Sequence, residues 1–292
     1  MKDQIEINGE TRIVGIIGDP VSHSLSPCMH NAAFAAKALD AVYIPWPVAV
    51  EDFPTALQAV RRMENFSGGN VTVPHKEHAA KLCDGLSPEA EALGAVNTLV
   101  AQDGRLFGHN TDGAGFLRSL EEGGFDPKGK RVLLLGAGGA AKAVAFALAG
   151  AGTAELTIAN RTLERAEALA ALLRGRSPGC QILALSLHNK PLAPAIASAD
   201  LVVNATTLGL KPEDPSPIDW GPLNSRALAV DLIYNPTETA FLKGASRRGL
   251  KVQNGLGMLL YQGAAAFELW TKEAAPLGAM RAALRAAFSR KL

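Results

Sequence analysis

Along this chain, short runs of apolar and often β-branched residues alternate with longer segments whose apolar positions recur at helical spacing. That alternation is typical of α/β proteins, in which strands joined through helices pair in parallel by right-handed crossovers. In the first third of the sequence we expect strands at residues 12–17, 42–47 and 70–73. The helices expected between and after these strands lie at residues 27–39, 52–64, 75–82 and 88–93.

A tight turn further along predicts a hairpin. The dipeptide Asp-Gly separates the apolar runs 97–101 and 105–109, and this dipeptide favours a two-residue turn between antiparallel strands. Because such a turn sets the pairing of its strands, counting outward from it places Asn97 opposite Asn110. Asp112 lies two residues beyond, so we expect the hairpin to bring Asn97 and Asp112 to the same end.

A second α/β run begins after a glycine-rich loop at 123–129. Its strands are expected at residues 131–135, 156–159, 181–185, 201–204, 229–233 and 251–253, with helices between most of them. From Gly257 onward the sequence is rich in alanine, which favours helix, and it predicts one or two C-terminal helices.

Composition narrows the class of protein. The chain is 48% hydrophobic and 20% charged, which is ordinary for a globular protein with a sizeable core. Its net charge is +1, its aromatic content is 5%, and it has no basic run, so a nucleic-acid surface is not expected. No stretch reaches the ~18 apolar residues of a membrane span, and no apolar signal core opens the sequence. The 3 cysteines form no Cys-x-x-Cys pair and favour reduced thiols in the cytoplasm.

A glycine-rich loop follows the strand expected at 131–135. Residues 136–141 read Gly-Ala-Gly-Gly-Ala-Ala and match the pattern Gly-x-Gly-x-x-Ala at the start of a helix expected at 140–149. Without side chains in the way, backbone N–H groups can approach a pyrophosphate, and the helix N-terminus adds partial positive charge. The same pattern also occurs as a structural glycine turn, whereas a Walker A loop is excluded because no Gly-Lys-Ser/Thr closes it. The cofactor-binding residues expected here are Gly136, Ala137, Gly138, Gly139 and Ala140.

The end of the next strand indicates which dinucleotide binds. A site for NAD places an acidic residue about 20 residues after the glycines, on the ribose 2′-hydroxyl. This chain instead has Asn160, Arg161 and Thr162 there, with Arg165 one turn later. No carboxylate is present to repel a 2′-phosphate, and two guanidiniums are available to bind one, so the sequence favours NADP. Taken alone, Arg165 is also consistent with a solvated helix face.

These patterns predict an α/β protein of two domains with a cleft between them. The first is a substrate-binding and catalytic α/β domain of residues 1–112, onto which C-terminal helices at 256–292 pack back. The second is a Rossmann-type dinucleotide-binding domain of residues 113–255. A length of 292 residues fits this division, since domains usually span roughly 100–200 residues.

Two serines lie just beyond the first strand of the first domain. Ser26 and Pro27 are expected to begin a helix, with Ser26 as its N-cap, and Ser24 lies just ahead of them. Two hydroxyls at the positive end of a helix suit a carboxylate group. Capping alone would account for one serine.

A lysine and three more polar residues complete the candidate substrate site. Lys76 follows the strand that ends in Val-Pro, and Thr72, Asn97 and Asp112 are its expected neighbours. In open parallel sheets, ligands bind beyond the carboxyl ends of the strands. A lysine beside an aspartate is usually a surface ion pair of little energy, but beside a nicotinamide the pair can protonate a ketone oxygen as hydride arrives.

The histidines do not predict a metal site. His23 and His30 suit packing or hydrogen bonding, and the pair His75-x-x-His78 lacks a third convincing ligand. No metal is therefore expected.

Together these motifs resemble those of the shikimate dehydrogenase family, and the resemblance spans nearly the whole chain. The matching segments of the first domain are Gly18-x-Pro20-x-x-His23-Ser24-x-Ser26-Pro27-x-x-His30-Asn31, Asn70-Val-Thr-x-Pro-x-Lys76, Gly94-Ala-Val-Asn97-Thr98 and Asn110-Thr-Asp112-Gly. The later segments are Gly136-Ala-Gly-Gly-Ala, Asn160-Arg-Thr, Asn204-Ala-Thr, Asp231-x-x-Tyr234-Asn-Pro and Asn254-Gly-Leu-Gly-Met258 with Gln262. Where many members carry Ser after the Asn-Ala-Thr run, this chain has Thr207, which keeps the hydroxyl.

The resemblance implies an NADP-dependent oxidoreductase acting on CH–OH, which reversibly reduces 3-dehydroshikimate to shikimate in chorismate and aromatic amino-acid biosynthesis. It implies that Lys76 is the acid/base, paired with Asp112, and that Ser24 and Ser26 hold the substrate carboxylate. The residues implied at the rest of the substrate are Thr72, Asn97, Asp112, Tyr234 and Gln262. Further residues implied at the cofactor are Thr206, Gly255 and Met258.

Two other functions remain open. One is a quinate/shikimate dehydrogenase that uses NAD, against which Arg161 and Arg165 argue. The other is a non-catalytic NADP-binding sensor, which the retained Lys76 and Asp112 disfavour. The expected partner is the small-molecule substrate rather than nucleic acid or membrane, and the chain is expected to be a monomer or a homodimer.

Overall fold

The computed structural model describes residues 6–188, 192–221, 224 and 226–289 of the chain. It divides the chain into two compact units of mixed α/β structure. The first unit comprises Met1–Thr111 and Leu260–Leu292, and the second unit comprises Asp112–Leu259. The division falls within one helix, α10 (Leu256–Thr271).

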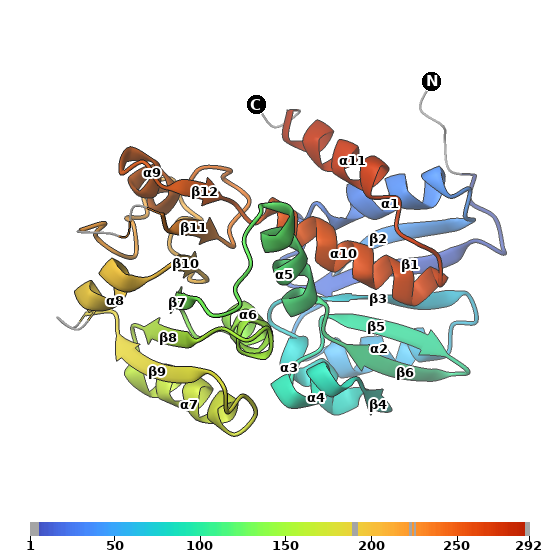
Figure 1. The fold of residues 1–292 in the computed structure, drawn as a ribbon. Helices are drawn as coiled ribbons and strands as arrows, with labels where there is room; N and C mark the ends of the chain where they lie inside the picture. The colour runs from blue at the N-terminus through green and yellow to red at the C-terminus, as the bar shows by residue number, and fades with distance from the viewer. Residues whose placement is uncertain (1–5, 189–191, 222–223, 225, 290–292) are drawn as a thin grey trace. The chain divides into compact units, whose positions relative to one another are not determined.

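The first unit is built on a six-stranded mixed sheet with the strand order β2-β1-β3-β5-β6-β4 (Figure 1). Its strands are β1 (Arg12–Gly18), β2 (Ala41–Pro47), β3 (Phe66–Val71), β4 (Gly85–Leu86), β5 (Thr98–Gln102) and β6 (Arg105–His109). β1 pairs in parallel with β2 and β3, whereas β5 runs antiparallel to β3 and β6. The carboxyl ends of β1 and β3 therefore share an edge of the sheet with the start of β5.

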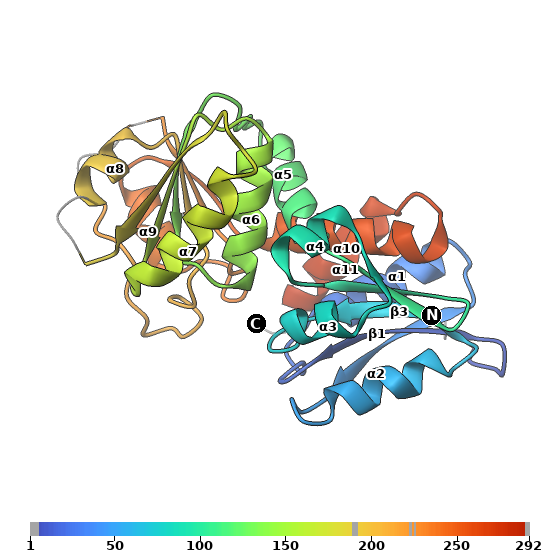
Figure 2. The same cartoon turned by 90° about the horizontal axis from the view of Figure 1, so that it is seen from below.

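Helices cover both faces of this sheet (Figure 2). They are α1 (Ser26–Ala36), α2 (Phe53–Arg61), α3 (Lys76–Leu82), α4 (Pro88–Leu93), the later turns of α10 and α11 (Leu277–Ser289). On one face, Phe53 and Leu57 of α2 pack with the buried Ile17 and Leu99 of the sheet. On the other face α1 packs against α11, and Phe34 of α1 lies 5.6 Å from the ring of Phe267 in α10.

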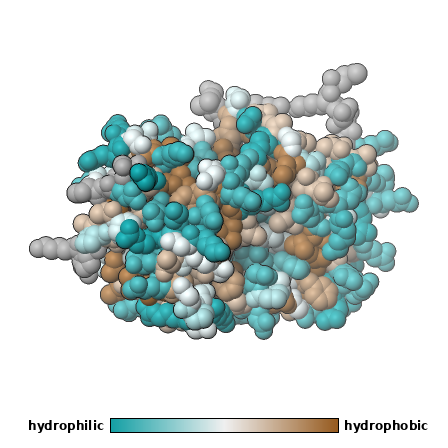
Figure 3. Space-filling view, viewed as in Figure 1, coloured by the Kyte–Doolittle hydropathy of each residue, from teal (hydrophilic) through white to brown (hydrophobic). Residues whose placement is uncertain are grey.

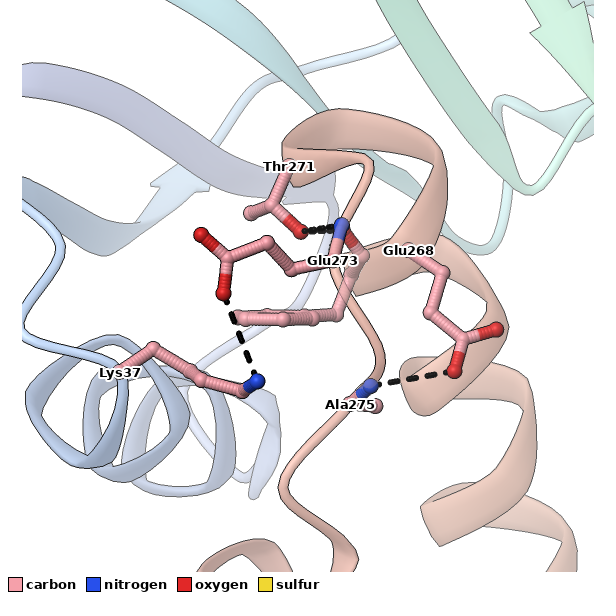
Figure 4. A network of polar contacts seen from close by, with 6 residues as sticks. Lys37, Glu268, Thr271, Glu273 and Ala275 are labelled. Carbon is pink, nitrogen blue, oxygen red and sulfur yellow. Dashed lines mark hydrogen bonds and ion pairs between the residues drawn. The ribbon is translucent and has the colours of Figure 1, made fainter.

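A small polar network holds the connection between α10 and α11 beside α1 (Figure 4). The Lys37 ammonium lies 3.4 Å from a carboxylate oxygen of Glu273. The Thr271 hydroxyl accepts a hydrogen bond from the Glu273 N–H, and the Glu268 carboxylate accepts one from the Ala275 N–H. Because exposed ion pairs of this kind contribute little free energy, the apolar faces of these helices carry most of the packing energy.

The predicted hairpin register is confirmed, and some element bounds are not. β5 and β6 pair Thr98 with His109 and Gln102 with Arg105, as the Asp-Gly turn requires. β3 starts at Phe66 rather than at residue 70, because its first half reads Ser-Gly-Gly and lacks the apolar alternation of a strand. The two-residue strand β4 and the helix α5 (Asp112–Glu122) were not expected.

The second unit is a six-stranded parallel sheet with the order β12-β11-β10-β7-β8-β9. Its strands are β7 (Arg131–Leu135), β8 (Glu155–Asn160), β9 (Gln181–Ser186), β10 (Leu201–Asn204), β11 (Leu228–Asp231) and β12 (Lys251–Gln253). The chain moves outward from β7 to β9, returns to β10 beside β7, and moves outward again to β12. This order is that of a doubly wound dinucleotide-binding fold, and it confirms the Rossmann-type topology expected for this part of the chain.

Two apolar cores lie on the two faces of this sheet. The helices of the unit are α5, α6 (Gly139–Gly150), α7 (Leu163–Arg174), α8 (Leu192–Ser198) and α9 (Ala240–Arg247). One core joins Val144 and Leu148 of α6 to Leu134 of β7, and the other joins Phe241 of α9 to Leu133 of β7. Successive residues of β7 thus face opposite cores, which is why this strand is apolar and buried from Val132 to Leu135.

The visible surface is mostly hydrophilic, and its brown, hydrophobic patches are small and scattered (Figure 3). Within the residues that the structure describes, no helix combines the length and the apolar character that crossing a bilayer requires.

His30 is a buried titratable group whose neutral form the fold requires. Its side chain is fully buried in α1, stacks on Tyr43 with ring centroids 4.5 Å apart, and finds no hydrogen-bond partner for either ring nitrogen. Burial lowers the pKa of His30 from 6.5 to about 3. Below about pH 6.5 the unfolded chain binds a proton on His30 that the folded chain does not bind. The free energy of unfolding therefore has its full value above that pH and falls as the pH drops toward 3.

His30→Phe should remove this acid sensitivity and keep the aromatic stack. Between pH 7 and pH 5 the wild type should lose about 2 kcal/mol of unfolding free energy that the variant retains. Urea unfolding of the first unit, followed by tryptophan fluorescence at both pH values, measures the difference. Equal losses in the two proteins would show that His30 is not the group responsible.

Candidate active site

The loop that follows β1 lies against the end of β3. The Thr72 N–H donates to the Ile17 carbonyl at 2.9 Å, and the Asp19 N–H donates to the Val73 carbonyl at 3.1 Å. A β-carbon on Gly18 would overlap the Thr72 methyl group, so only glycine permits this approach. The segments carrying the two serines and the lysine are thereby brought to one edge of the sheet.

Ser24 and Ser26 both lie at the start of α1, but not as expected. The helix begins at Ser26, and its N-cap position is Leu25, which makes no side-chain cap. The Ser24 hydroxyl instead accepts the Ser26 N–H at 3.2 Å, so the expectation that Ser26 is the N-cap is wrong. Ser24 does the capping because its oxygen lies two residues ahead, within reach of an N–H that the first turn leaves unpaired. Ser26 is buried and Ser24 is partly buried.

Lys76 is the first residue of α3, directly after the turn that leaves β3. Its carbonyl accepts the Val96 N–H at 2.9 Å, which fixes the start of the helix beside Asn97. The preceding His75 is buried, stacks on Phe53 at 4.2 Å between ring centroids, and its Nε2 lies 2.7 Å from the Val48 carbonyl oxygen. His75 therefore anchors the turn rather than facing a ligand. Across the described ranges, no three His, Cys, Asp or Glu side chains gather as a metal site.

Both the backbone and the side chain of Asn97 make hydrogen bonds at the same edge of the sheet. Its carbonyl accepts the Val71 N–H at 2.8 Å, and its N–H donates to the His109 carbonyl at 3.0 Å. Its side-chain oxygen accepts the Thr111 N–H at 2.8 Å, and its Nδ2 donates to the Thr111 hydroxyl at 3.0 Å. Thr111 directly precedes Asp112, which is buried at the start of α5.

Sequence reasoning missed three partners of the Asn97 side chain and carbonyl. They are Thr111, Thr98, whose hydroxyl donates to Asn97 Oδ1 at 2.9 Å, and Asn70, whose Nδ2 donates to the Asn97 carbonyl at 3.2 Å. All three belong to the quoted sequence motifs, but nothing in the spacing of these motifs indicates that their side chains meet.

In the second unit, the glycine-rich loop leaves the carboxyl end of β7 as expected. Gly136 has φ of +109°, and a β-carbon there would lie 2.8 Å from the Ala205 carbonyl oxygen, so the turn requires glycine. Gly138 is the N-cap of α6 and Gly139 its first residue. Both are exposed, and β-carbons on them would meet nothing within 4 Å. The start of this twelve-residue helix, whose first N–H groups have no partner within the helix, is thus open to solvent, as a pyrophosphate site requires.

The two arginines lie at the end of β8. Asn160 closes the strand and its Nδ2 donates to the Thr162 carbonyl at 2.8 Å, which forms a small turn. Thr162 is the N-cap of α7, and Arg165 lies in the first turn of that helix. Arg161 and Arg165 are both exposed. Because β8 pairs in parallel with β7, these guanidiniums share an edge of the sheet with the glycine loop.

A buried acid organises the loops after β10 and β11. Asp231 accepts hydrogen bonds from the Asn204 amide at 3.1 Å, the Ile233 N–H at 3.0 Å and the Thr239 hydroxyl at 2.6 Å. Asn204 in turn accepts the Thr206 N–H at 3.1 Å and the Thr206 hydroxyl at 2.7 Å. Burial raises the pKa of Asp231, and its three donors partly oppose that rise.

The remaining candidates lie in the last third of the chain. The Gly255 N–H donates to the Ile233 carbonyl at 3.1 Å, and Met258 is buried in the first turns of α10. Tyr234 follows β11 and is partly buried. These three residues belong to the second unit, whereas Gln262 of the same helix is buried in the first unit.

The chemistry of these edges differs between the two units. The first gathers an amine, hydroxyls and amides, which suit a small polar molecule with an acid group and hydroxyls. The second offers a glycine-lined helix start with guanidiniums nearby, which suit a phosphorylated dinucleotide.

Comparison with known proteins gives three family matches in chain order. Residues 16–99 match the shikimate dehydrogenase substrate binding domain, residues 120–210 match shikimate / quinate 5-dehydrogenase, and residues 255–285 match the shikimate 5'-dehydrogenase C-terminal domain.

Full-length relatives are similar over nearly the whole chain. A shikimate dehydrogenase (NADP(+)) of Moorella thermoacetica is 51% identical over 97% of this chain and 96% of its own. A solved shikimate dehydrogenase in complex with NADP+ has a TM-score of 0.89 and 38% identity, covering 97% of both chains. The shikimate 5-dehydrogenase from Thermus thermophilus in complex with NADP(H) and shikimate has a TM-score of 0.82 and 42% identity, covering 94% of this chain and 99% of that one.

The Asp231 network predicts a difference between two substitutions. Asp231→Ala leaves three buried donors without an acceptor and should lower the unfolding free energy of the second unit by about 3 kcal/mol. Asp231→Asn keeps the shape and one amide oxygen, and its Nδ2 can donate to the Thr239 hydroxyl, so it should cost about 1 kcal/mol. Urea unfolding followed by Trp220 fluorescence compares them. Equal losses would mean that the hydrogen bonds of Asp231 do not hold these loops.

Proposed function

The chain belongs to the shikimate dehydrogenase family, and from that membership we propose that it catalyses the reversible NADPH-dependent reduction of 3-dehydroshikimate to shikimate. This reaction lies on the route to chorismate and the aromatic amino acids. The observation that carries the proposal is the edge of the first unit, where the start of α3 at Lys76 is hydrogen-bonded beside Asn97 and the Thr111-Asp112 step. We further propose that the enzyme acts in the cytoplasm, as a monomer or a homodimer.

In this proposal most of the residues that bind the substrate belong to the first unit, and Asp112 and Tyr234 belong to the second. The hydroxyls of Ser24 and Ser26, at the start of α1, hold the carboxylate, where the helix end adds partial positive charge. The ring hydroxyls are met by Thr72, Asn97, Asp112 and Gln262, with Tyr234 near the substrate. Hydroxyl and amide groups suit this task because they match a neutral ring hydroxyl as either donor or acceptor.

Lys76 supplies the proton chemistry. In the reducing direction its ammonium donates a proton to the ketone oxygen, and in the oxidising direction its amine takes the proton back from the alcohol. Asp112 is proposed to pair with Lys76, which would direct the ammonium at the reacting oxygen. When bound, the nicotinamide supplies or accepts the hydride at the ring carbon.

The residues of the second unit fit NADP. The open start of α6 at Gly138 and Gly139 suits the pyrophosphate, and the exposed Arg161 and Arg165 suit a 2′-phosphate, since neither has a carboxylate partner among the described residues. The other residues proposed to contact the cofactor are Gly136, Ala137, Ala140, Asn160, Thr162, Thr206, Gly255 and Met258.

Rates on two substrates with two cofactors test the function. Shikimate and quinate are each oxidised with NADP or NAD, and absorbance of the reduced nicotinamide is followed. We expect the highest kcat/KM for shikimate with NADP. A preference for quinate with NAD would favour the rival dehydrogenase, and no absorbance change with any pair would favour a non-catalytic sensor.

Lys76→Ala should lower kcat by about 10²–10⁴-fold with a modest change in KM, because the interaction lost is made in the transition state. The double variant Ser24→Ala/Ser26→Ala is the matched comparison, and it should mainly raise KM for shikimate. Steady-state oxidation of shikimate measures both. An unchanged kcat in Lys76→Ala would remove Lys76 from the chemistry.

A further inference from the structure

A chain of buried, uncharged polar side chains crosses the sheet of the first unit. The Tyr43 hydroxyl of β2 donates to Asn70 Oδ1 of β3 at 2.7 Å, and Asn70 Nδ2 donates to Thr98 Oγ1 of β5 at 3.2 Å. Thr98 Oγ1 donates to Asn97 Oδ1 at 2.9 Å, and Asn97 Nδ2 donates to Thr111 Oγ1 at 3.0 Å. All five residues are buried. The chain thus begins at a tyrosine and ends at the polar edge described above.

Backbone groups fix the direction in which every donor of this chain points. Asn70 Nδ2 also donates to the Asn97 carbonyl, which can only accept, so the oxygen of the Asn70 amide must face Tyr43. The Thr111 N–H can only donate, and it donates to Asn97 Oδ1, so the Nδ2 of that amide faces Thr111. Between the two amides, Thr98 accepts from Asn70 and gives its one hydrogen to Asn97.

Aromatic side chains surround Tyr43, the first residue in this series of hydrogen bonds. Its ring stacks on His30 at 4.5 Å between centroids with 14° between the planes, and the Trp270 ring lies 6.1 Å away. The Trp270 indole N–H donates to the Leu99 carbonyl at 2.8 Å, which ties this aromatic cluster to β5. Burial raises the pKa of Tyr43 well above its usual value, partly offset by a hydrogen bond with Ser26, so the hydroxyl keeps its proton.

We propose that Tyr43, acting through Asn70 and Thr98, is a positioning residue that fixes the side-chain amide of Asn97 for the substrate. This inference rests on the proposed function, in which Asn97 meets a ring hydroxyl. Tyr43 reaches Asn97 only through other residues, since three hydrogen bonds separate its hydroxyl from that amide. Its hydroxyl also contacts Ser26, which is proposed to hold the carboxylate, and the double-mutant cycle with Asn97→Ala separates the two routes. Without the phenolic hydrogen, Asn70 Oδ1 loses its donor in a buried site. The side chains that follow in this series of hydrogen bonds then become less well ordered.

Two variants remove one hydroxyl each from this chain at nearly constant volume, Tyr43→Phe and Thr98→Val. Each should raise KM for shikimate about tenfold, the equivalent of one buried hydrogen bond, with kcat changed less than about threefold. Thr98→Ser keeps the hydroxyl and should behave as the wild type.

The matched control is Thr11→Val. Thr11 is a buried threonine that precedes β1, at the opposite edge of the sheet, and its hydroxyl accepts the Asn8 N–H at 2.9 Å. Its loss should lower stability to a similar degree and leave KM for shikimate unchanged. An equal rise of KM in Thr11→Val would assign the effect to stability alone and overturn the inference.

A double-mutant cycle separates positioning from a general effect. If Tyr43 acts through Asn97, then adding Tyr43→Phe to Asn97→Ala should change KM less than about twofold further. A full, additive rise of KM in the Asn97→Ala background would show that Tyr43 does not act through this amide.

Hydrogen exchange of the Thr111 N–H tests the positioning without catalysis. This N–H donates to Asn97 Oδ1, so a loosened amide in Tyr43→Phe should speed its exchange about tenfold, while Thr11→Val should leave it unchanged. Unchanged exchange in Tyr43→Phe overturns the inference even if the wild type proves inactive on shikimate, an outcome that would by itself count only against the proposed function. Faster exchange with an unchanged KM would overturn the role in substrate binding.

Discussion

The polar edge of the first unit depends on the hydrogen bonds of one residue, Asn97. Its backbone joins β3 to the end of β6 through Val71 and His109, and its side chain accepts and donates to Thr111. A buried amide with fewer partners would cost about 1–3 kcal/mol for each group left unsatisfied, so the loop beyond β6 has little freedom to move away. The residues proposed for chemistry therefore lie on a frame whose geometry is set by satisfied backbone and amide groups rather than by charges.

In the second unit a buried asparagine also holds a loop at the end of a strand. Asn204, the last residue of β10, accepts both the N–H and the hydroxyl of Thr206 and donates to Asp231. Each unit thus places a buried asparagine at a strand end, where its amide closes the loop that carries candidate ligand-binding groups. An amide suits this position because it donates and accepts at once, whereas a carboxylate can only accept and a lysine can only donate.

The sequence predicted features that are local or periodic, and it missed contacts between neighbouring strands. The unbroken apolar run of β7, the glycine turn at Gly136 and the Asp-Gly hairpin each have a signature within a few residues, and the structure confirms all three. The first half of β3 was missed because Ser-Gly-Gly has no strand signature, and its place comes from pairing with β1. The contacts of Asn70, Thr98 and Thr111 with Asn97 were missed because they join different strands. A sequence motif shows that these residues occur together, but it does not indicate which of their side chains are in contact.

The buried network of the first unit keeps its protonation state over a wide pH range. In the first unit, the chain from Tyr43 to Thr111 contains amides and hydroxyls, and its one ionisable member has a pKa raised well above its usual value by burial. The His30 ring stacked on it is neutral above about pH 3. No proton therefore enters or leaves this chain over the range in which an amine and a carboxylate can exchange protons with a substrate, and the direction of its donors stays constant while the chemistry proceeds. A network that titrated in that range would reorient the Asn97 amide as the pH changed, so the proposed positioning requires that the network stay neutral.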